Sequence, residues 1–251
     1  RYLTVGKIIK DNIVVSIDEI DNYLAESIAG SPANYAHYVN EQENAEFLRT
    51  ARQVVGNMVK QFEMKKAADL NKRVSVARTG VLDVMRLTRY KFDDDLFLRN
   101  TIIPNGKNHG MIMLVDWSSS MSNVLKDTLR QVVVLSMFCK KLNIPFDVYA
   151  FQSSSNPFKA YKPLKNGESY YDRTAVEGFS VMKDFDQEKH VEIRDFCLLH
   201  LLSSTSKKNS WLKSLNNVLV LSQWRPGIFG LGSTPLDDAL LTMPQIIEDF
   251  Q

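Results

Sequence analysis

The chain has 251 residues, 44% of them hydrophobic and 24% charged, which is typical of a folded globular protein and argues against extensive disorder. Lysine and arginine number 31 against 29 aspartate and glutamate, so the formal net charge is only +2. This balance gives no general electrostatic attraction to nucleic acid or to an anionic membrane, and we expect neither as a partner.

Both cysteines, Cys139 and Cys197, stand in apolar surroundings. Free cysteine in such a context usually behaves as a small buried hydrophobe, which favours a reducing compartment. No run approaches the roughly 18 apolar residues that cross a bilayer, and no basic segment with an apolar signal core opens the sequence. We therefore expect a cytoplasmic protein.

The first part of the chain predicts mainly helices. Residues 2–15 mix β-branched residues with Gly and Asn, which predicts a short strand or two before a helix over 16–28. Apolar residues recur at helical spacing over 41–70, which predicts a long amphipathic helix. The pattern over 72–99 does not decide between helix and strand. We divide this part into an N-terminal segment, 1–40, and a helical or extended lead-in region, 41–105.

A clearer pattern begins after Gly110. Residues 111–115 form a short continuous apolar run, which is typical of a buried parallel strand. A polar loop follows, then a helix predicted over 122–142 and ended by Asn143-Ile144-Pro145, then a strand predicted over 146–151. Strand, helix and strand in this order form a crossover unit, so we predict an α/β fold.

The remaining residues predict a long insertion and further helices. Residues 152–188 are polar and too numerous for an ordinary connection, so we interpret them as an insertion. Helices are predicted over 191–202, 211–221 and 235–250, with a polar linker over 203–210 between the first two.

Oxygen-bearing side chains follow the predicted strand. Asp116, Ser118 and Ser120 stand at alternating positions of the loop. Carboxylate and hydroxyl oxygens at this spacing can converge, and such hard ligands suit Mg²⁺ or Mn²⁺. Open parallel sheets also bind ligands beyond the carboxyl ends of their strands. The alternative is that Asp116 and the serines cap the following helix, a position that these residue types favour.

The strand, the Asp-x-Ser-x-Ser loop and the helix after it resemble the metal-ion-dependent adhesion site of von Willebrand factor A domains. The resemblance implies a central, mainly parallel sheet over residues 106–251, preceded by a helical N-terminal segment. It also implies another hydroxyl ligand from a threonine on a later loop. Gly232-Ser233-Thr234-Pro235-Leu236 is similar to the Gly-Thr-Pro-Leu form of the chelatase branch, which makes Thr234 that ligand. Thr174 is a competing candidate that lacks this Gly and Pro context.

The last site residue of that family is an aspartate at the end of a later strand. No such strand follows Thr234 in the sequence, so we expect this residue beyond Gln251, in a domain truncated at its C-terminus. Asp237 and Asp238 could assist the metal, although acids in the first turn of a helix more often interact with the helix dipole.

Residues before the Asp-x-Ser-x-Ser motif make the resemblance more specific. Gly80-Val81-Leu82-Asp83, Arg86-Leu87 with Arg89, and Phe97-Leu98-Arg99 are similar to the segment before the A domain in CobT-type cobaltochelatase subunits and in CobT-like proteins of large tailed phages. The resemblance covers residues 45–155 and the Thr234 loop. The series Arg78, Arg86, Arg89 and Arg99 has two interpretations, a functional role or a face paired with Asp93-Asp94-Asp95.

The resemblance implies a metal-dependent protein-interaction subunit that acts beside a MoxR-type or CobS-type AAA+ ATPase on a protein client, in metal chelation or protein remodelling. The alternative is a structural or assembly component, for example one encoded by a phage, that uses the A domain only for protein contacts. The sequence has no phosphate-binding glycine loop, nucleophile elbow or paired-carboxylate signature, so we expect no catalytic residues and at most an accessory role. If the protein is encoded by a phage, the expected cytoplasmic location becomes the host cytoplasm or a virion, and an oligomer is compatible with either function.

Overall fold

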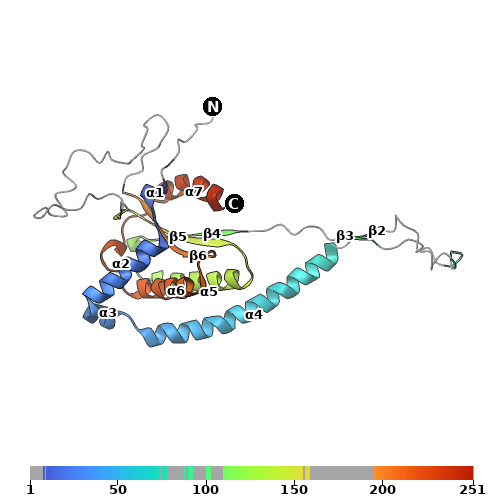
Figure 1. Ribbon diagram of the computed structural model, residues 1–251, viewed down its shortest axis with the longest axis horizontal. Helices are drawn as coiled ribbons and strands as arrows, with labels where there is room; N and C mark the ends of the chain where they lie inside the picture. Colours follow the sequence, from blue (N-terminus) through green and yellow to red (C-terminus); the bar gives the residue numbers. More distant parts are fainter. Residues whose placement is uncertain are drawn as a thin grey trace, which may run out of the picture.

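The computed structural model describes residues 8, 10–73, 75–77, 88, 90–92, 100–102, 110–154, 156–158 and 195–250. A four-stranded sheet in the order β1-β6-β5-β4 lies at its centre (Figure 1). Its strands are β1 (Val14–Val15), β4 (Met111–Asp116), β5 (Phe146–Gln152) and β6 (Cys197–Ser203). The pairs β4 with β5 and β1 with β6 are parallel, whereas β5 and β6 are antiparallel. The predicted α/β fold with a mainly parallel sheet is confirmed at this level.

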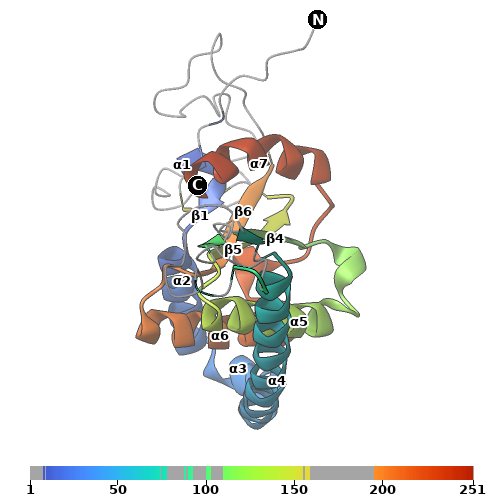
Figure 2. The ribbon, with the colours of Figure 1, turned by 90° about the vertical axis from the view of Figure 1, so that its right-hand side faces the viewer.

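Helices cover both faces of this sheet. They are α1 (Lys10–Ile13), α2 (Ile17–Gly30), α3 (Pro32–Tyr38), α4 (Glu41–Arg73), α5 (Leu125–Lys141), α6 (Lys208–Gln223) and α7 (Leu236–Phe250), with short 3₁₀ turns η2 (Ser119–Met121) and η4 (Gly227–Phe229). Helices α1 and α7 lie on one face, and α2, α5 and α6 lie on the other (Figure 2). Helix α4 packs against α5 and then extends toward the pair β2 (Ser75–Ala77) and β3 (Asn100–Ile102).

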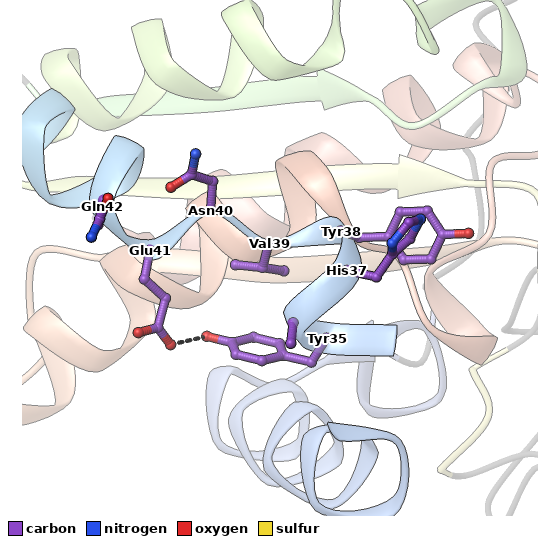
Figure 3. Close-up of a pocket in the computed structure, with 8 residues that line it drawn as sticks. Tyr35, His37, Tyr38, Val39, Asn40, Glu41 and Gln42 are labelled. Atoms are coloured by element: carbon purple, nitrogen blue, oxygen red, sulfur yellow. Dashed lines mark hydrogen bonds between the residues drawn. The ribbon is translucent and has the colours of Figure 1, made fainter. Parts of the chain in front are cut away.

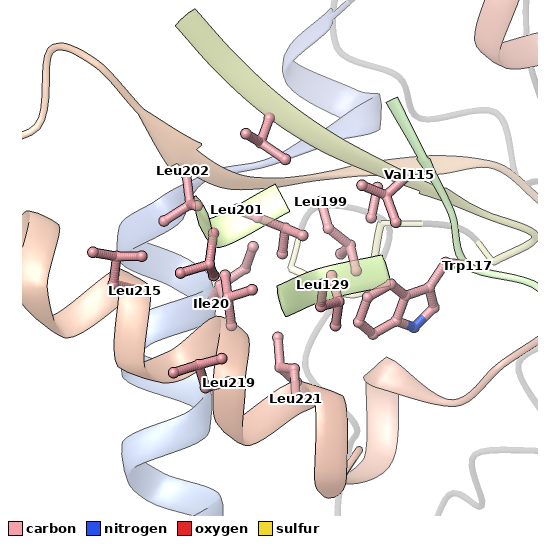
Figure 4. Packing of buried hydrophobic residues seen from close by; sticks show 14 of the residues in the cluster. Ile20, Val115, Trp117, Leu129, Leu199, Leu201, Leu202, Leu215, Leu219 and Leu221 are labelled. Carbon is pink, nitrogen blue, oxygen red and sulfur yellow. The ribbon is translucent and has the colours of Figure 1, made fainter. Parts of the chain in front are cut away.

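The strands alternate their apolar side chains between two clusters, as the two-residue period of a strand requires. Val115, Val148 and Leu199 belong to the larger cluster, which the sheet shares with α2, α5 and α6 (Figure 4). Phe151 and Leu198 belong to a smaller cluster that includes residues of α7. Both faces of the sheet are therefore apolar, which explains why β4, β5 and β6 are nearly continuous apolar runs.

Several predicted helices are confirmed, with local causes visible in the structure. Helix α2 begins after Ser16, whose side chain and that of Glu19 form a capping box. In α4, the side chains of Ala51, Val55 and Val59 are buried at successive turns, which is the stripe that the sequence predicts. The helices predicted over 122–142, 211–221 and 235–250 correspond to α5, α6 and α7.

The helix predicted over 191–202 is wrong, because Cys197–Ser203 form strand β6 in the middle of the sheet. The apolar run there is continuous, and a continuous run of about 4–8 residues fits a buried strand as well as a buried helix. Packing on both sides decides the outcome, since Cys197 and Leu199 enter the larger cluster and Leu198 the smaller one.

Some predictions fall outside the described residues. These are most of the 152–188 insertion, Thr174, the arginine series with its aspartates, and most of the upstream segment with CobT-like residues. The division into 1–40, 41–105 and 106–251 stays a prediction. Residues of the first segment nevertheless join the central fold, because β1 pairs with β6 and Ile20 and Leu24 of α2 lie in the larger cluster.

Candidate metal centre

Asp116 is the last residue of β4 and pairs with Phe151 of β5, so its carboxylate stands at the carboxyl edge of the parallel pair. Its Oδ1 atom is buried and, within the described part of the chain, has no hydrogen-bonding partner. A buried oxygen without a partner costs roughly 1–3 kcal/mol, and more when it is charged. A bound cation would remove that cost, so the environment of Asp116 suits its predicted role as a metal ligand.

The two serine hydroxyls of the motif converge. Ser118 Oγ lies 2.8 Å from Ser120 Oγ, and the Ser118 side chain is buried whereas Ser120 is exposed. The alternative that these residues cap the next helix does not hold, because α5 begins at Leu125 and its N-cap is Val124, without a side-chain hydrogen bond. The motif instead forms a loop that continues into the turn η2.

A second loop lies against the first. Gly232 forms an isolated parallel bridge with Ser118, its carbonyl accepts a hydrogen bond from the Ser119 amide at 2.8 Å, and its amide donates to the Trp117 carbonyl at 3.4 Å. Thr234 follows two residues later and is exposed. The structure thus joins the segment that carries Thr234 to the loop that carries Asp116, although the two are far apart in the sequence.

Trp117 anchors the Asp116 loop and the second loop to the hydrophobic core, a role that the sequence analysis did not predict. Its side chain is fully buried in the larger cluster, to which Leu129 of α5 also belongs (Figure 4). Its indole Nε1 donates to the Phe229 carbonyl at 2.9 Å, so the residue also holds the start of the second loop. The sequence signal for this role is a large aromatic residue between two candidate oxygen ligands.

Asp237 and Asp238 lie in the first turn of α7, where negative charge interacts favourably with the positive end of the helix dipole. Burial, and secondarily the charge of Asp237, raise the pKa of Asp238 above its ordinary value of 3.8. The position in the helix accounts for both residues without a metal.

The described residues contain no group of three or more His, Cys, Asp or Glu side chains placed to hold a metal ion. A metal at the carboxyl edge would therefore use the Asp116 carboxylate with hydroxyl oxygens, a set that suits a hard cation rather than Zn²⁺. Cys139 and Cys197 are free and buried. Burial raises the pKa of both thiols above the ordinary value of 9.0, and that of Cys197 to about 11, so both stay protonated at neutral pH.

A surface pocket at the junction of α3 and α4 is lined by residues 35–42 and by no member of the candidate centre (Figure 3). The Tyr35 hydroxyl donates to Glu41 Oε1 at 2.7 Å. Burial, and then this carboxylate, raise the pKa of Tyr35 to about 12. Its phenol therefore stays protonated and hydrogen-bonded to Glu41, which favours a structural role for the pair.

Comparison of the chain with protein-family models, with curated proteins and with solved structures gave no match. Across the described ranges, no helix combines the length and the apolar character needed to cross a membrane.

Proposed function

We propose that this chain is a metal-dependent protein-interaction subunit with a von Willebrand factor A type domain. Asp116, Ser118, Ser120 and Thr234 would hold Mg²⁺ or Mn²⁺, and the ion would supply an electrophilic centre with positions open to a partner's oxygen ligand. The observation that carries this proposal is that Asp116 Oδ1 is buried and has no hydrogen-bonding partner among the described residues, while the hydroxyls of Ser118 and Ser120, two and four residues later, converge. The docked Gly232 loop supports it, because it brings the Thr234 segment to the same edge.

We further propose, from the CobT-like residues, that the partner is a MoxR-type or CobS-type AAA+ ATPase and that the pair acts in the cytoplasm on a protein client or in metal chelation. A pull-down with the full-length protein, with and without Mg²⁺, tests this. Recovery of an AAA+ ATPase should require both Mg²⁺ and Asp116, so Asp116→Ala should lose it. Equal recovery by the variant, or recovery in chelator, would contradict the proposal.

An assembly component that needs no metal is the second candidate, and one observation favours it. Helix α7 exposes large apolar side chains directly after the second loop, with Leu236 at 47% and Leu240 at 56%. Apolar surface of this kind supports protein contacts by itself. In the same pull-down, metal-independent recovery of structural proteins would favour this candidate.

A further inference from the structure

The second loop is attached to β5 as well as to the Asp116 loop. Ser153 directly follows Gln152, the last residue of β5. Its Oγ accepts a hydrogen bond from the Ser233 amide at 2.7 Å. Ser233 is the residue before Thr234, so this contact lies next to the proposed threonine ligand.

Gly232 leaves the space that the Ser153 hydroxyl occupies. A Cβ atom at Gly232 would lie 2.4 Å from Ser153 Oγ, but 3.6 Å from its carbonyl oxygen and 3.7 Å from its Cβ. The backbone of Gly232 is not in the left-handed region, unlike that of Gly227. Glycine is therefore favoured at position 232 for a steric reason, which is the close approach of Ser153 Oγ.

We propose that Ser153 is a positioning residue of the metal centre, which sets the place of the Thr234 segment through the Ser233 amide. This inference rests on the proposed metal centre and adds a residue outside the ligand motif. The contacts that hold the second loop include the backbone bridge to Ser118, the hydrogen bond from Ser119 Oγ to the Leu231 carbonyl, the Trp117 indole and the Ser153 hydroxyl. Only the last of these contacts joins the loop to β5 next to Thr234.

Removal of the hydroxyl should loosen the loop without removing a ligand. Ser153→Ala leaves the Ser233 amide without its acceptor, a loss that corresponds to Mn²⁺ binding about three- to tenfold weaker. The matched control is Ser154→Ala, because the Ser154 hydroxyl accepts from Gln152 and lies near Cys197 instead. Titration calorimetry with Mn²⁺ measures both variants against the wild type.

A double-mutant cycle tests the contact through the free energy of unfolding in metal-free buffer. Gly232→Ala should destabilise the wild type because its methyl group meets Ser153 Oγ. The same substitution should cost much less in the Ser153→Ala background, where that oxygen is absent. Coupling of this sign supports a direct contact, and additive effects would overturn it.

The two experiments separate the possible failures. Wild-type Mn²⁺ binding that weakens in Ser153→Ala but not in Ser154→Ala supports the positioning role. Wild-type binding that Ser153→Ala leaves unchanged overturns that role and leaves the metal centre standing. No Mn²⁺ binding by the wild type overturns the metal centre and the positioning role together, whatever the cycle shows about the contact.

Discussion

On the face of the sheet that α2, α5 and α6 cover, Leu125 and Leu129 of α5 and Leu219 of α6 are completely buried. On the opposite face, α7 buries Ala239 and Ile246 but leaves Leu240 56% exposed. The first face therefore supplies most of the apolar burial that stabilises the fold, whereas the helix on the second face keeps part of its apolar surface exposed. The centre joins the two faces, because Trp117 enters the larger cluster and the second loop continues into α7.

The largest effect is expected at Trp117. Trp117→Ala removes a fully buried indole and its hydrogen bond to Phe229, which should lower the free energy of unfolding by about 3–5 kcal/mol. Urea denaturation measures this change. Trp117→Phe, which keeps most of the ring and loses the donor, should cost clearly less; a loss below about 1 kcal/mol for Trp117→Ala would show that this face does not carry the stability.

A smaller effect, dependent on pH, is expected where α2 meets α6. The Asp21 carboxylate is buried there and accepts hydrogen bonds from Asn217 and Ser214. Burial raises its pKa above the ordinary 3.8 and outweighs these bonds and the charge of Lys213. The folded state thus holds the proton more tightly, so the contribution of this group is fully present below pH 3.8 and is lost as pH rises through the raised pKa.

Asp21→Asn removes this titration while it keeps the shape of the side chain. Urea denaturation of the wild type and the variant from pH 3.5 to about 7 should show the difference in stability shifting toward the variant as pH rises. A difference that is constant with pH, or that shifts toward the wild type, would contradict the direction assigned to the pKa.

The smallest effect is expected on the exposed side of α7. Leu240→Ser should change the free energy of unfolding by no more than about 0.5 kcal/mol, because the side chain is already largely in water. Ile246→Ala on the buried side of the same helix should cost about 2–5 kcal/mol. Equal costs at the two positions would mean that α7 has no free apolar side and that the two faces do not differ as described.

The sequence predicts correctly those elements whose hydrophobic pattern fits only one type of secondary structure. The apolar run 111–115 with a polar loop after it, and the 3.6-residue spacing in α4, α5 and α6, correspond to elements of the structure. The prediction of a helix at β6 is wrong because periodicity cannot separate a buried strand from a buried helix, and only packing on both sides of the run decides between them. The parallel pairing of β1 with β6 depends on contacts across most of the chain, which local patterns do not contain.

The candidate centre was predictable in part for the same reason. Asp116, Ser118 and Ser120 lie within five residues, so their spacing is visible in the sequence. The docking of Gly232 against Ser118, and the contact of Ser153 with Ser233, join segments that are distant in sequence and are visible only after folding.

The most direct test of the metal centre is titration calorimetry of Mg²⁺ and Mn²⁺ into the wild type and Asp116→Ala. We expect the wild type to bind and the variant to lose binding. The metal-free variant should unfold at the same denaturant concentration or a higher one, because it loses a buried oxygen that has no partner among the described residues. Binding by the variant at the wild-type level, or no binding by either protein, would contradict the assignment of Asp116 as a metal ligand.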